Sequence, residues 1–391
     1  MKKLGLFILL ILSLQLSFGQ QKLSDRAIVN VITCGPGSQL FTSFGHSAFH
    51  IYDPVHQIST VYNFGTFDFD APNFYLNFAK GKLTYFLSKG SMSRFLQAYN
   101  YEQRWVESQE LNLNPSQVQA MYYFLENNAL EENRYYAYDF FFDNCSTRIE
   151  DVVKEVLKTD VQFNNSHINT EKSHRDLIAD YTKNAKWGKF GIDLALGSVI
   201  DDKATKDEYK FLPDYILAAF NNAEIFTTGT RVPLVKNQRT LLKPTPKPKS
   251  AFSITNSPFI VILLVSLILA FFTYRNWKKK SRSRILDFLV FVVTGLVGVV
   301  VLLLWFATDH TATYQNYNFL WAFAPNLLVA FYIIKKEVPN WLRSYYKLLI
   351  VLLMLMLLFW LFSIQVYNIA LLPLIIVLVL RYWVLLRVGE V

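Results

Sequence analysis

The run Asp143-Asn144-Cys145-Ser146-Thr147-Arg148 stands directly before a segment with helical spacing. Five apolar residues follow it at intervals of three and four, which is the pattern of one buried helix face. They are Ile149, Val152, Val153, Val156 and Leu157. The Asp-Asn pair before Cys145 and the Ser-Thr pair after it supply side chains that can cap a helix start. The sequence therefore predicts that Cys145 lies at or near a helix N-terminus.

A cysteine in this place is suited to nucleophilic chemistry. The N-terminus of a helix carries partial positive charge and free N–H donors, and both stabilise a thiolate over a thiol. The chain has one other cysteine, Cys34. In an exported protein the two cysteines could instead form a disulfide, which would make Cys145 a structural residue.

A thiolate nucleophile needs a base, and a segment with two histidines lies upstream of Cys145. Residues 44–52 read as a strand, followed by a turn at 53–57 and a second strand at 58–64. His46 and His50 share one face of the first strand, because side chains along a strand alternate with a period of two. We therefore look for the base on this strand.

The N-terminus has the form of a secretory signal, which we place at residues 1–19. Met1-Lys2-Lys3 precedes an apolar run at 4–16, and Ser17-Phe18-Gly19 stands before the expected cut. An uncleaved membrane anchor is the alternative, although the run is short for a span. No cysteine follows the cut directly, so we expect that the mature protein is not itself a lipoprotein.

The second half of the chain reads as a membrane domain. Hydrophobic residues make up 52% of the 391 residues, and the excess lies after residue 250. We predict an exported domain at 20–241, a Pro- and Lys-rich linker at 242–256 and a transmembrane domain at 257–391. We expect an all-α bundle of about five spans, at 257–274, 285–306, 319–334, 348–364 and 367–380.

The distribution of charge predicts the orientation and the partners. Basic residues gather at 275–284, at 335–347 and in the C-terminal tail, so these parts are expected in the cytoplasm. The net charge of +9 would often indicate nucleic acid binding, but here it is concentrated beside the spans and sets the topology. We therefore expect the membrane, and no nucleic acid, as a partner.

No Cys-x-x-Cys spacing is present, and we expect no metal ion and no cofactor.

Three further features have two interpretations each. The aromatic run at 135–142 can be core packing, which we favour, or a groove that faces lipid. Asp309 and His310, in the polar stretch at 308–325, can belong to an ordinary loop at the outer membrane interface. Alternatively, they bind a lipid headgroup or complete a site from the membrane side. Asp143 and Arg148 can orient their loop, bind a headgroup or form a structural salt bridge.

Several motifs together resemble the Lnb-type lipoprotein N-acyltransferases of the Bacteroidetes. In the exported part they are Gly45-His46-Ser47-Ala48, Tyr62-Asn63-Phe64-Gly65-Thr66-Phe67, Phe78-x-x-Gly81-Lys82-Leu83-x-Tyr85, Arg104, Gln109-x-Leu111-x-Leu113 and the run from Tyr138 to Arg148. In the membrane part they are Thr308-Asp309-His310, Asn316-x-Asn318, Trp321 and Pro325. The resemblance covers almost the whole mature chain.

The resemblance implies a fold and an activity. The order of histidine and then cysteine is also similar to the permuted papain-like fold of lecithin:retinol acyltransferase relatives, so the exported domain is expected to be α+β. The implied enzyme is a lipoprotein N-acyltransferase of the inner membrane, multi-pass, with its catalytic domain in the periplasm. It moves an acyl chain from a phospholipid, through a cysteine thioester, to the α-amino group of a diacylglyceryl-cysteine on a lipoprotein.

The implied catalytic residues are Cys145 as the nucleophile, His46 as the base and a third polar residue. By position the third residue is Asn63, with Tyr62 and His50 left open. Asn144 could donate to the oxyanion. Asp143, Arg148, Asp309 and His310 are expected in binding or supporting roles.

Two other classes of function remain open from the sequence. A membrane-anchored cysteine hydrolase, either a phospholipase or a cell-wall peptidase, would use the same pair of residues. A membrane scaffold without activity would have Cys34 and Cys145 in a disulfide. The extensive membrane half favours the transferase over a hydrolase that acts on a soluble peptide.

Overall fold

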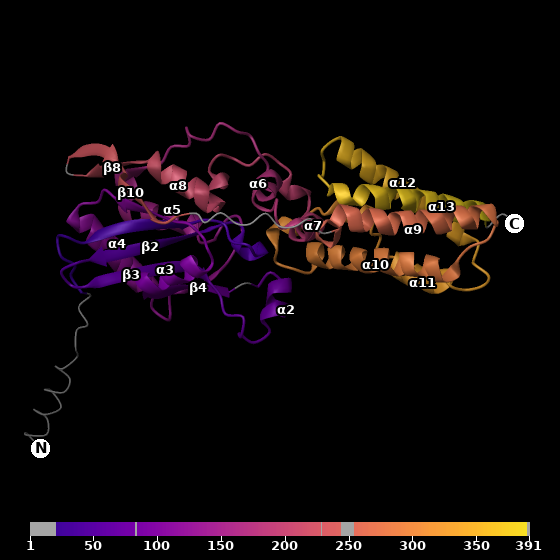
Figure 1. Ribbon diagram of the computed structural model, residues 1–391, viewed down its shortest axis with the longest axis horizontal. Helices are drawn as coiled ribbons and strands as arrows, with labels where there is room; N and C mark the ends of the chain where they lie inside the picture. The colour runs from indigo at the N-terminus through magenta and orange to yellow at the C-terminus, as the bar shows by residue number, and fades with distance from the viewer. Residues whose placement is uncertain (1–20, 83, 228, 244–253, 389–391) are drawn as a thin grey trace, which may run out of the picture.

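The computed structural model describes residues 21–82, 84–227, 229–243 and 254–388, which form a mixed α/β domain followed by a bundle of helices (Figure 1). The predicted signal at 1–19 lies outside the described residues, as does most of the predicted linker at 242–256. The fold is therefore α+β with a helical C-terminal region, as the sequence predicts.

The first domain is built on a seven-stranded sheet in which every neighbouring pair is antiparallel. The strand order is β10-β5-β1-β2-β3-β4-β6. The strands are β1 (Ile28–Cys34), β2 (His46–Asp53), β3 (Ile58–Thr66), β4 (Thr84–Ser91), β5 (Val106–Leu111), β6 (Tyr135–Ala137) and β10 (Val235–Leu242). A second sheet joins β7 (Val161–Gln162), β8 (Glu224–Thr227) and β9 (Thr230–Pro233).

Helices cover both faces of the large sheet. On one face α4 (Pro115–Asn128), α5 (Thr147–Leu157) and α8 (Pro213–Asn221) pack against residues such as Val31, Phe49 and Phe64. On the other face α3 (Met92–Tyr101) covers residues that include Ile32 and Cys34. The predicted apolar face of α5 is confirmed, because its residues lie in the first of these cores.

Three short helices lie at the end of the domain that faces the bundle: α2 (Phe74–Ala79), α6 (His174–Tyr181) and α7 (Lys186–Ala195) (Figure 1). The bundle itself contains α9 (Pro258–Lys278), α10 (Arg284–Phe306), α11 (Asn326–Ile333), α12 (Trp341–Leu361) and α13 (Leu372–Val388). In the described part of the chain, four helices are long and apolar enough to cross a membrane. They are Pro258–Lys278, Arg284–Phe306, Trp341–Leu361 and Ile369–Val388.

The third predicted span, at 319–334, is not one regular helix. It consists of a 3₁₀ turn at Tyr317–Leu320, a turn, and α11, which has 8 residues. A helix of that length rises about 12 Å, far less than the roughly 30 Å of a bilayer core. The segment nevertheless returns along α10, because Ile333 at its far end accepts a hydrogen bond from Arg282, which lies just before α10 begins (2.6 Å).

Two glycines of α10 explain why the third segment can be irregular. A Cβ at Gly298 would lie 1.9 Å from the carbonyl oxygen of Ala322, and one at Gly295 would lie 2.3 Å from the backbone nitrogen of Leu327. The backbone therefore approaches α10 too closely for any side chain at these two positions. Non-helical backbone is tolerated at membrane depth only where protein covers it, and Ala322 is fully buried.

Candidate active site

Cys145 lies between β6 and α5, immediately before Ser146, which is the N-cap residue of that helix. The side-chain oxygen of Asn144 accepts hydrogen bonds from the N–H groups of Ser146 (2.7 Å) and Thr147 (3.0 Å), so Asn144 caps the helix start. The predicted position of Cys145 at a helix N-terminus is confirmed. The same position gives the thiolate the positive end of the helix dipole.

Asn144 has no hydrogen left to offer to a substrate. Its amide nitrogen donates to the carbonyl oxygens of Phe140 (2.7 Å) and Phe211 (2.9 Å), and the residue is 3% exposed. In this structure Asn144 therefore supports the loop that carries Cys145, and it does not act as the oxyanion donor that we considered from the sequence.

His46 begins β2 and its ring faces both Cys145 and Asn63. Its Nε2 atom is hydrogen-bonded to the side-chain oxygen of Asn63, which lies on the neighbouring strand β3. The remaining ring nitrogen, Nδ1, is then the one available to the thiol. Gly65, also on β3 and with a φ of +82°, brings the strand close to Cys145, because a Cβ there would lie 3.3 Å from the Cβ of Cys145.

The other two candidates for the third residue point elsewhere. His50 contacts Ser59 (3.0 Å) and Asn30 (3.4 Å), and the hydroxyl of Tyr62 donates to Glu126. His46 and His50 stand four residues apart on one strand but make separate contacts.

In the described ranges no three His, Cys, Asp or Glu side chains are grouped so that they could hold a metal ion.

Cys145 and His46 shift each other's ionisation. Burial opposes the charged form of Cys145, but the attraction and hydrogen bond of His46, aided by the backbone N–H of Ser47, outweigh it and lower the pKa of Cys145. Burial likewise opposes the charged form of His46, but Cys145 and Asn63 outweigh it and raise the pKa of His46. Both shifts favour a thiolate and imidazolium pair near neutral pH.

Both cysteines are free, so the disulfide that the sequence left open is not formed. Cys34 lies opposite His46 in the pairing of β1 with β2 and is fully buried. Burial is the largest effect on its thiol and raises the pKa of Cys34 far above the ordinary range. Cys34 is therefore a core residue whose thiol stays protonated, whereas Cys145 is the cysteine with a lowered pKa.

Alkylation of Cys145 by iodoacetamide is expected to reach half its maximal rate at a pH below about 8.5, the ordinary pKa of a cysteine thiol. The thiolate is the reacting form, and a lowered pKa keeps it populated at lower pH. In His46→Ala the attraction is lost while burial remains, so the midpoint should move above about 8.5. Peptide mass spectrometry over a pH series measures both rates, with Cys145→Ser as the unlabelled control. Equal midpoints in the two proteins would contradict the ion pair.

Cys145 and His46 open into a cavity of about 600 Å³ that lies between the two halves of the chain. Its walls are mainly apolar and aromatic, with residues such as Phe44, Phe67, Phe78, Tyr85, Tyr138 and Phe140. The run at 135–142 therefore contributes to this lining as well as to the core. A mainly apolar lining of this kind is suited to hydrocarbon.

The loop after α10 closes the cavity from the membrane side. Asp309 and His310 both line the cavity, as do Thr311 and Ala312. His310 Nε2 contacts the carbonyl oxygen of Phe78 (2.9 Å), and the backbone N–H of Asp309 donates to the carbonyl oxygen of Lys80 (2.9 Å). The structure thus brings together residues more than 200 positions apart, as expected if this loop completes the site.

Gly81 permits the contact between the two halves. It has a φ of +75°, and a Cβ at this position would lie 2.8 Å from the backbone nitrogen of His310. A side chain here would both strain the backbone and separate the loop from the domain.

Asp143 and Arg148 form a bidentate salt bridge outside the cavity. Arg148 also stacks on the ring of Tyr136, 4.3 Å from its centre. Of the three interpretations, the geometry supports a pair that orients the loop before α5.

The polar stretch at 308–325 divides into two parts with different roles. Its first part, with Asp309 and His310, reaches the cavity, whereas Asn316 and Asn318 hold the end of α7. Asn316 donates to the carbonyl oxygens of Leu194 (2.8 Å) and Ala195 (3.0 Å), and Asn318 donates to that of Asp193 (3.1 Å). Both asparagines are fully buried, so this second part is a structural joint between the domains.

Arg104 is a cavity residue to which we assigned no role from the sequence. It is 5% exposed, donates to the carbonyl oxygen of Gly35 (2.6 Å) and stacks on Tyr99, whose ring lies beside that of His46. Its place in a motif of the resembling family was the one signal for it. Arg104 therefore supports the histidine side of the site.

Two family models match this chain. Residues 15–179 match the Lnb N-terminal periplasmic domain, and residues 249–389 match the Lnb transmembrane domain. No match was found among the curated proteins or among the solved structures. The fold, the cavity and these matches define a membrane protein with a periplasmic α+β domain. The chain belongs to the Lnb-type family.

Proposed function

We propose that this protein transfers an acyl chain from a membrane phospholipid to the α-amino group of a diacylated lipoprotein, through a thioester on Cys145. The observation that carries the proposal is the position of the Cys145–His46 pair in an apolar cavity that a membrane loop helps to line. A soluble peptide substrate would not need this location. The proposed place of the reaction is the periplasmic face of the inner membrane.

In the first half-reaction the thiolate of Cys145 attacks the ester carbonyl of the phospholipid. The carbon–oxygen bond breaks, and the lysophospholipid leaves as an alcohol with a proton from the imidazolium of His46. The backbone N–H of Cys145 donates to no acceptor in the part of the chain that the structure describes, so it is free to stabilise the oxyanion. Asn63 holds the ring of His46 in position throughout.

In the second half-reaction the amine of the lipoprotein attacks the thioester. His46 takes the proton of the amine, the carbon–sulfur bond breaks, and the thiolate of Cys145 is restored. Water would compete with the amine, and the apolar walls of the cavity limit its access. Asp309 and His310 line the membrane side of the cavity, where a lipid headgroup would lie.

The order of the elements supports a permuted papain-like arrangement of this domain. The strand with His46 precedes the helix that follows Cys145, and the third residue lies on the strand after the histidine. The permuted papain-like fold of this domain is proposed together with the acyl transfer.

The test is expression of the protein in a strain that lacks its own lipoprotein N-acylation. The N-terminal peptide of one lipoprotein is expected to gain the mass of a single acyl chain, and membranes should accumulate lysophospholipid in equal amount. Release of free fatty acid with no change in the lipoprotein would identify a phospholipase instead. Cleaved cell-wall peptide would identify a peptidase.

A further inference from the structure

Helix α2 and its flanking residues, 67–82, form an unusually exposed apolar segment of the periplasmic domain. No residue of α2 is buried, and several of its large apolar side chains face outward. Their exposed fractions are 75% for Tyr75, 52% for Leu76 and 49% for Phe78, and that of Phe69 just before the helix is 52%. Exposed apolar patches of this kind mark interaction surfaces.

The segment lies at the level where the membrane helices end. Lys80 and Phe78 are held by Asp309 and His310, which follow the last residue of α10, Phe306, by three and four positions. Four residues of non-helical chain reach at most about 14 Å, so these contacts lie near the end of a spanning helix. Exposed aromatic residues at this end, such as Tyr314, are typical of the membrane–water interface.

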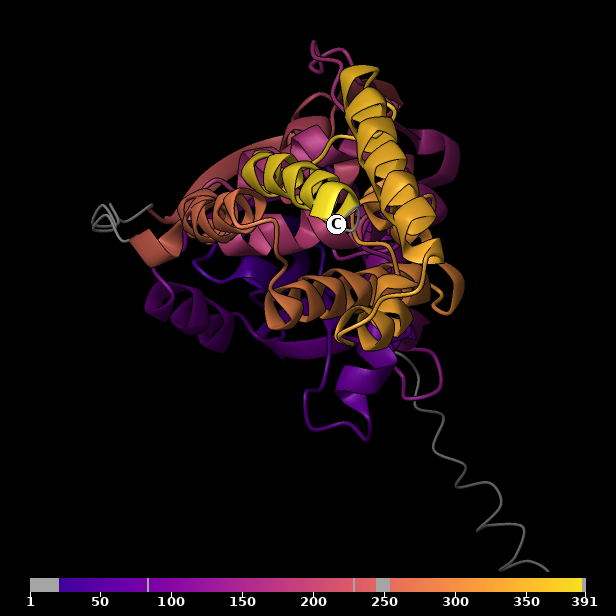
Figure 2. The same ribbon diagram turned by 90° about the vertical axis from the view of Figure 1, so that its right-hand side faces the viewer.

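The views of the molecule show where α2 lies relative to the membrane helices. Seen along the bundle, α2 lies outside the outline of the membrane helices, next to α10 and α11 (Figure 2). In the side view it is at the edge of the domain that faces the bundle (Figure 1). Lys80 and Lys82 follow the helix directly and are exposed, and Asp68 and Asp70 precede it. The basic end is therefore the one next to the membrane loop, where lipid phosphates lie.

A row of aromatic rings leads from α2 to the nucleophile. The successive ring contacts are Phe78–Phe74 (6.3 Å), Phe74–Phe67 (5.9 Å), Phe67–Tyr85 (5.1 Å) and Tyr85–Tyr138 (4.2 Å). Tyr85 and Tyr138 both line the cavity of Cys145. The row therefore ends at that cavity.

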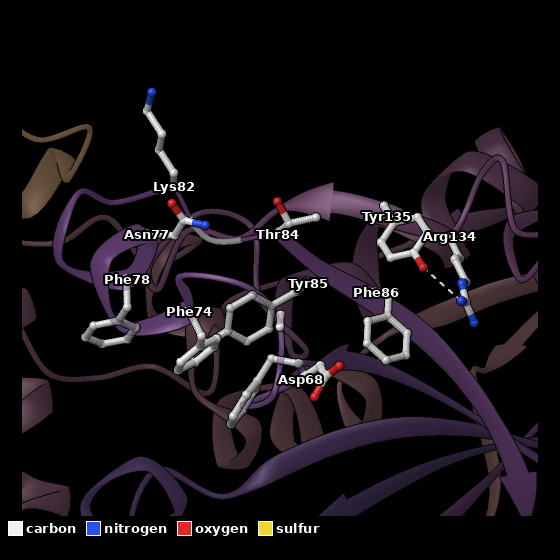
Figure 3. A pocket seen from close by; sticks show the side chains of 12 residues that line it. Asp68, Phe74, Asn77, Phe78, Lys82, Thr84, Tyr85, Phe86, Arg134 and Tyr135 are labelled. Carbon is white, nitrogen blue, oxygen red and sulfur yellow. Dashed lines mark hydrogen bonds between the residues drawn. The ribbon is translucent and has the colours of Figure 1, made fainter.

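A second cavity, of about 540 Å³, lies along the same row (Figure 3). It shares Phe67, Phe78 and Tyr85 with the cavity of Cys145, and it is also lined by Phe74 and Asn77 of α2. The aromatic side chains that the two cavities share therefore separate them. One of these, Phe78, belongs to α2, and another, Phe67, contacts Phe74 of α2. The lining of this second cavity is mixed, because Asp68, Lys82 and Arg134 stand beside the aromatic rings.

We propose that the α2 segment, residues 67–82, inserts into the outer leaflet of the membrane and forms the lateral entrance through which a phospholipid acyl chain reaches Cys145. The partner of the exposed face is the lipid surface, because the segment is continuous with the outer end of α10 and lies outside the bundle. The role as an entrance rests on the proposed function, whereas the membrane contact does not.

The membrane contact is tested with a fluorescent label at one position. Tyr75→Cys is made in the Cys145→Ser background, where the buried Cys34 does not react, and the labelled full chain is placed in phosphatidylethanolamine–phosphatidylglycerol vesicles. Lipids with brominated acyl chains are expected to quench this label strongly. Tyr101→Cys on α3 is the matched control, since Tyr101 is also an exposed tyrosine (88%) but lies on a helix farther from the bundle. Equal quenching at both positions would overturn the proposal. So would a label that is shielded by added lipoprotein but not quenched by lipid.

The role as an entrance is tested with the double variant Tyr75→Ser and Leu76→Ser. Neither residue lines either cavity, so alkylation of Cys145 by iodoacetamide should keep its wild-type rate and report an intact site. Acyl transfer from vesicle phospholipid is expected to fall about tenfold, because two apolar anchors in the leaflet are lost. An unchanged transfer rate would overturn the entrance. Failure of the wild type to transfer acyl chains would instead refute the proposed function and leave the quenching result standing.

Discussion

Replacing Cys145 by serine is expected to lower the rate of acyl transfer by at least about a thousandfold. A serine hydroxyl in this position ionises far less readily than a thiol, so His46 cannot hold it as an anion and no acyl-enzyme forms. The side chain is almost unchanged in size, and the loop is held by Asn144, so the fold should persist. The measurement is the rate of lysophospholipid release together with the mass of the lipoprotein N-terminal peptide.

His46→Ala should cause a loss of similar size, because the nucleophile and the base act as one unit. The double variant Cys145→Ser with His46→Ala is then expected to be no slower than either single variant. Asn63→Ala should be milder, by roughly ten- to a hundredfold, since Asn63 orients His46 and does not react. Full activity in Cys145→Ser would place the chemistry elsewhere, and losses that multiply in the double variant would show that the two residues act separately.

Arg175→Ala is expected to lower the free energy of unfolding by about 3–5 kcal/mol. Arg175 is 3% exposed and donates to the carboxylates of Asp201 (2.6 Å) and Asp193 (3.3 Å). It also donates to the carbonyl oxygens of Leu196 (3.2 Å) and Gly197 (2.9 Å) at the end of α7. Without the guanidinium, the buried carboxylate of Asp201 loses its cation and that of Asp193 keeps only Lys189, where the periplasmic domain meets the bundle. Burial is already the largest effect on Asp201 and raises its pKa.

The measurement is thermal unfolding of the full chain in detergent, followed by limited proteolysis of the junction. Lys189→Ala is the matched control, because Lys189 also pairs with Asp193 (2.7 Å) but is partly exposed, and it should cost less than about 1 kcal/mol. Arg175→Lys should remain destabilised, since an ammonium cannot serve two carboxylates and two carbonyls at once. A loss for Arg175→Ala no larger than that for Lys189→Ala would contradict the role of Arg175 in the junction.

Local patterns in the sequence were sufficient for the elements that bear Cys145 and His46. The spacing from Ile149 to Leu157 predicts α5, and the caps around Cys145 predict where it begins. The alternation in 44–64 predicts β2 and β3, and four of the spans follow from hydrophobicity alone. These features are local because helix periodicity, capping and membrane transfer energies depend on residues close together in the chain.

The third predicted span shows where local patterns fail. The stretch at 319–334 is apolar enough to suggest a full helix, but its backbone becomes irregular where Gly295 and Gly298 of α10 allow close contact. Hydrophobicity measures the cost of transfer into the membrane and says nothing of such a contact. The regular part is therefore only Asn326–Ile333.

By itself, the sequence determined the candidate nucleophile, the strand with the candidate base, the membrane half and the likeness to a family. The tertiary structure alone decided which polar residue orients His46, because that choice depends on the register between β2 and β3 and separates Asn63 from Tyr62. The tertiary structure also makes Asn144 the cap of α5. It brings Asp309 and His310 to the cavity of Cys145, although they lie far from Cys145 in the sequence. These outcomes depend on how distant segments pack, and no local spacing of residues encodes that packing.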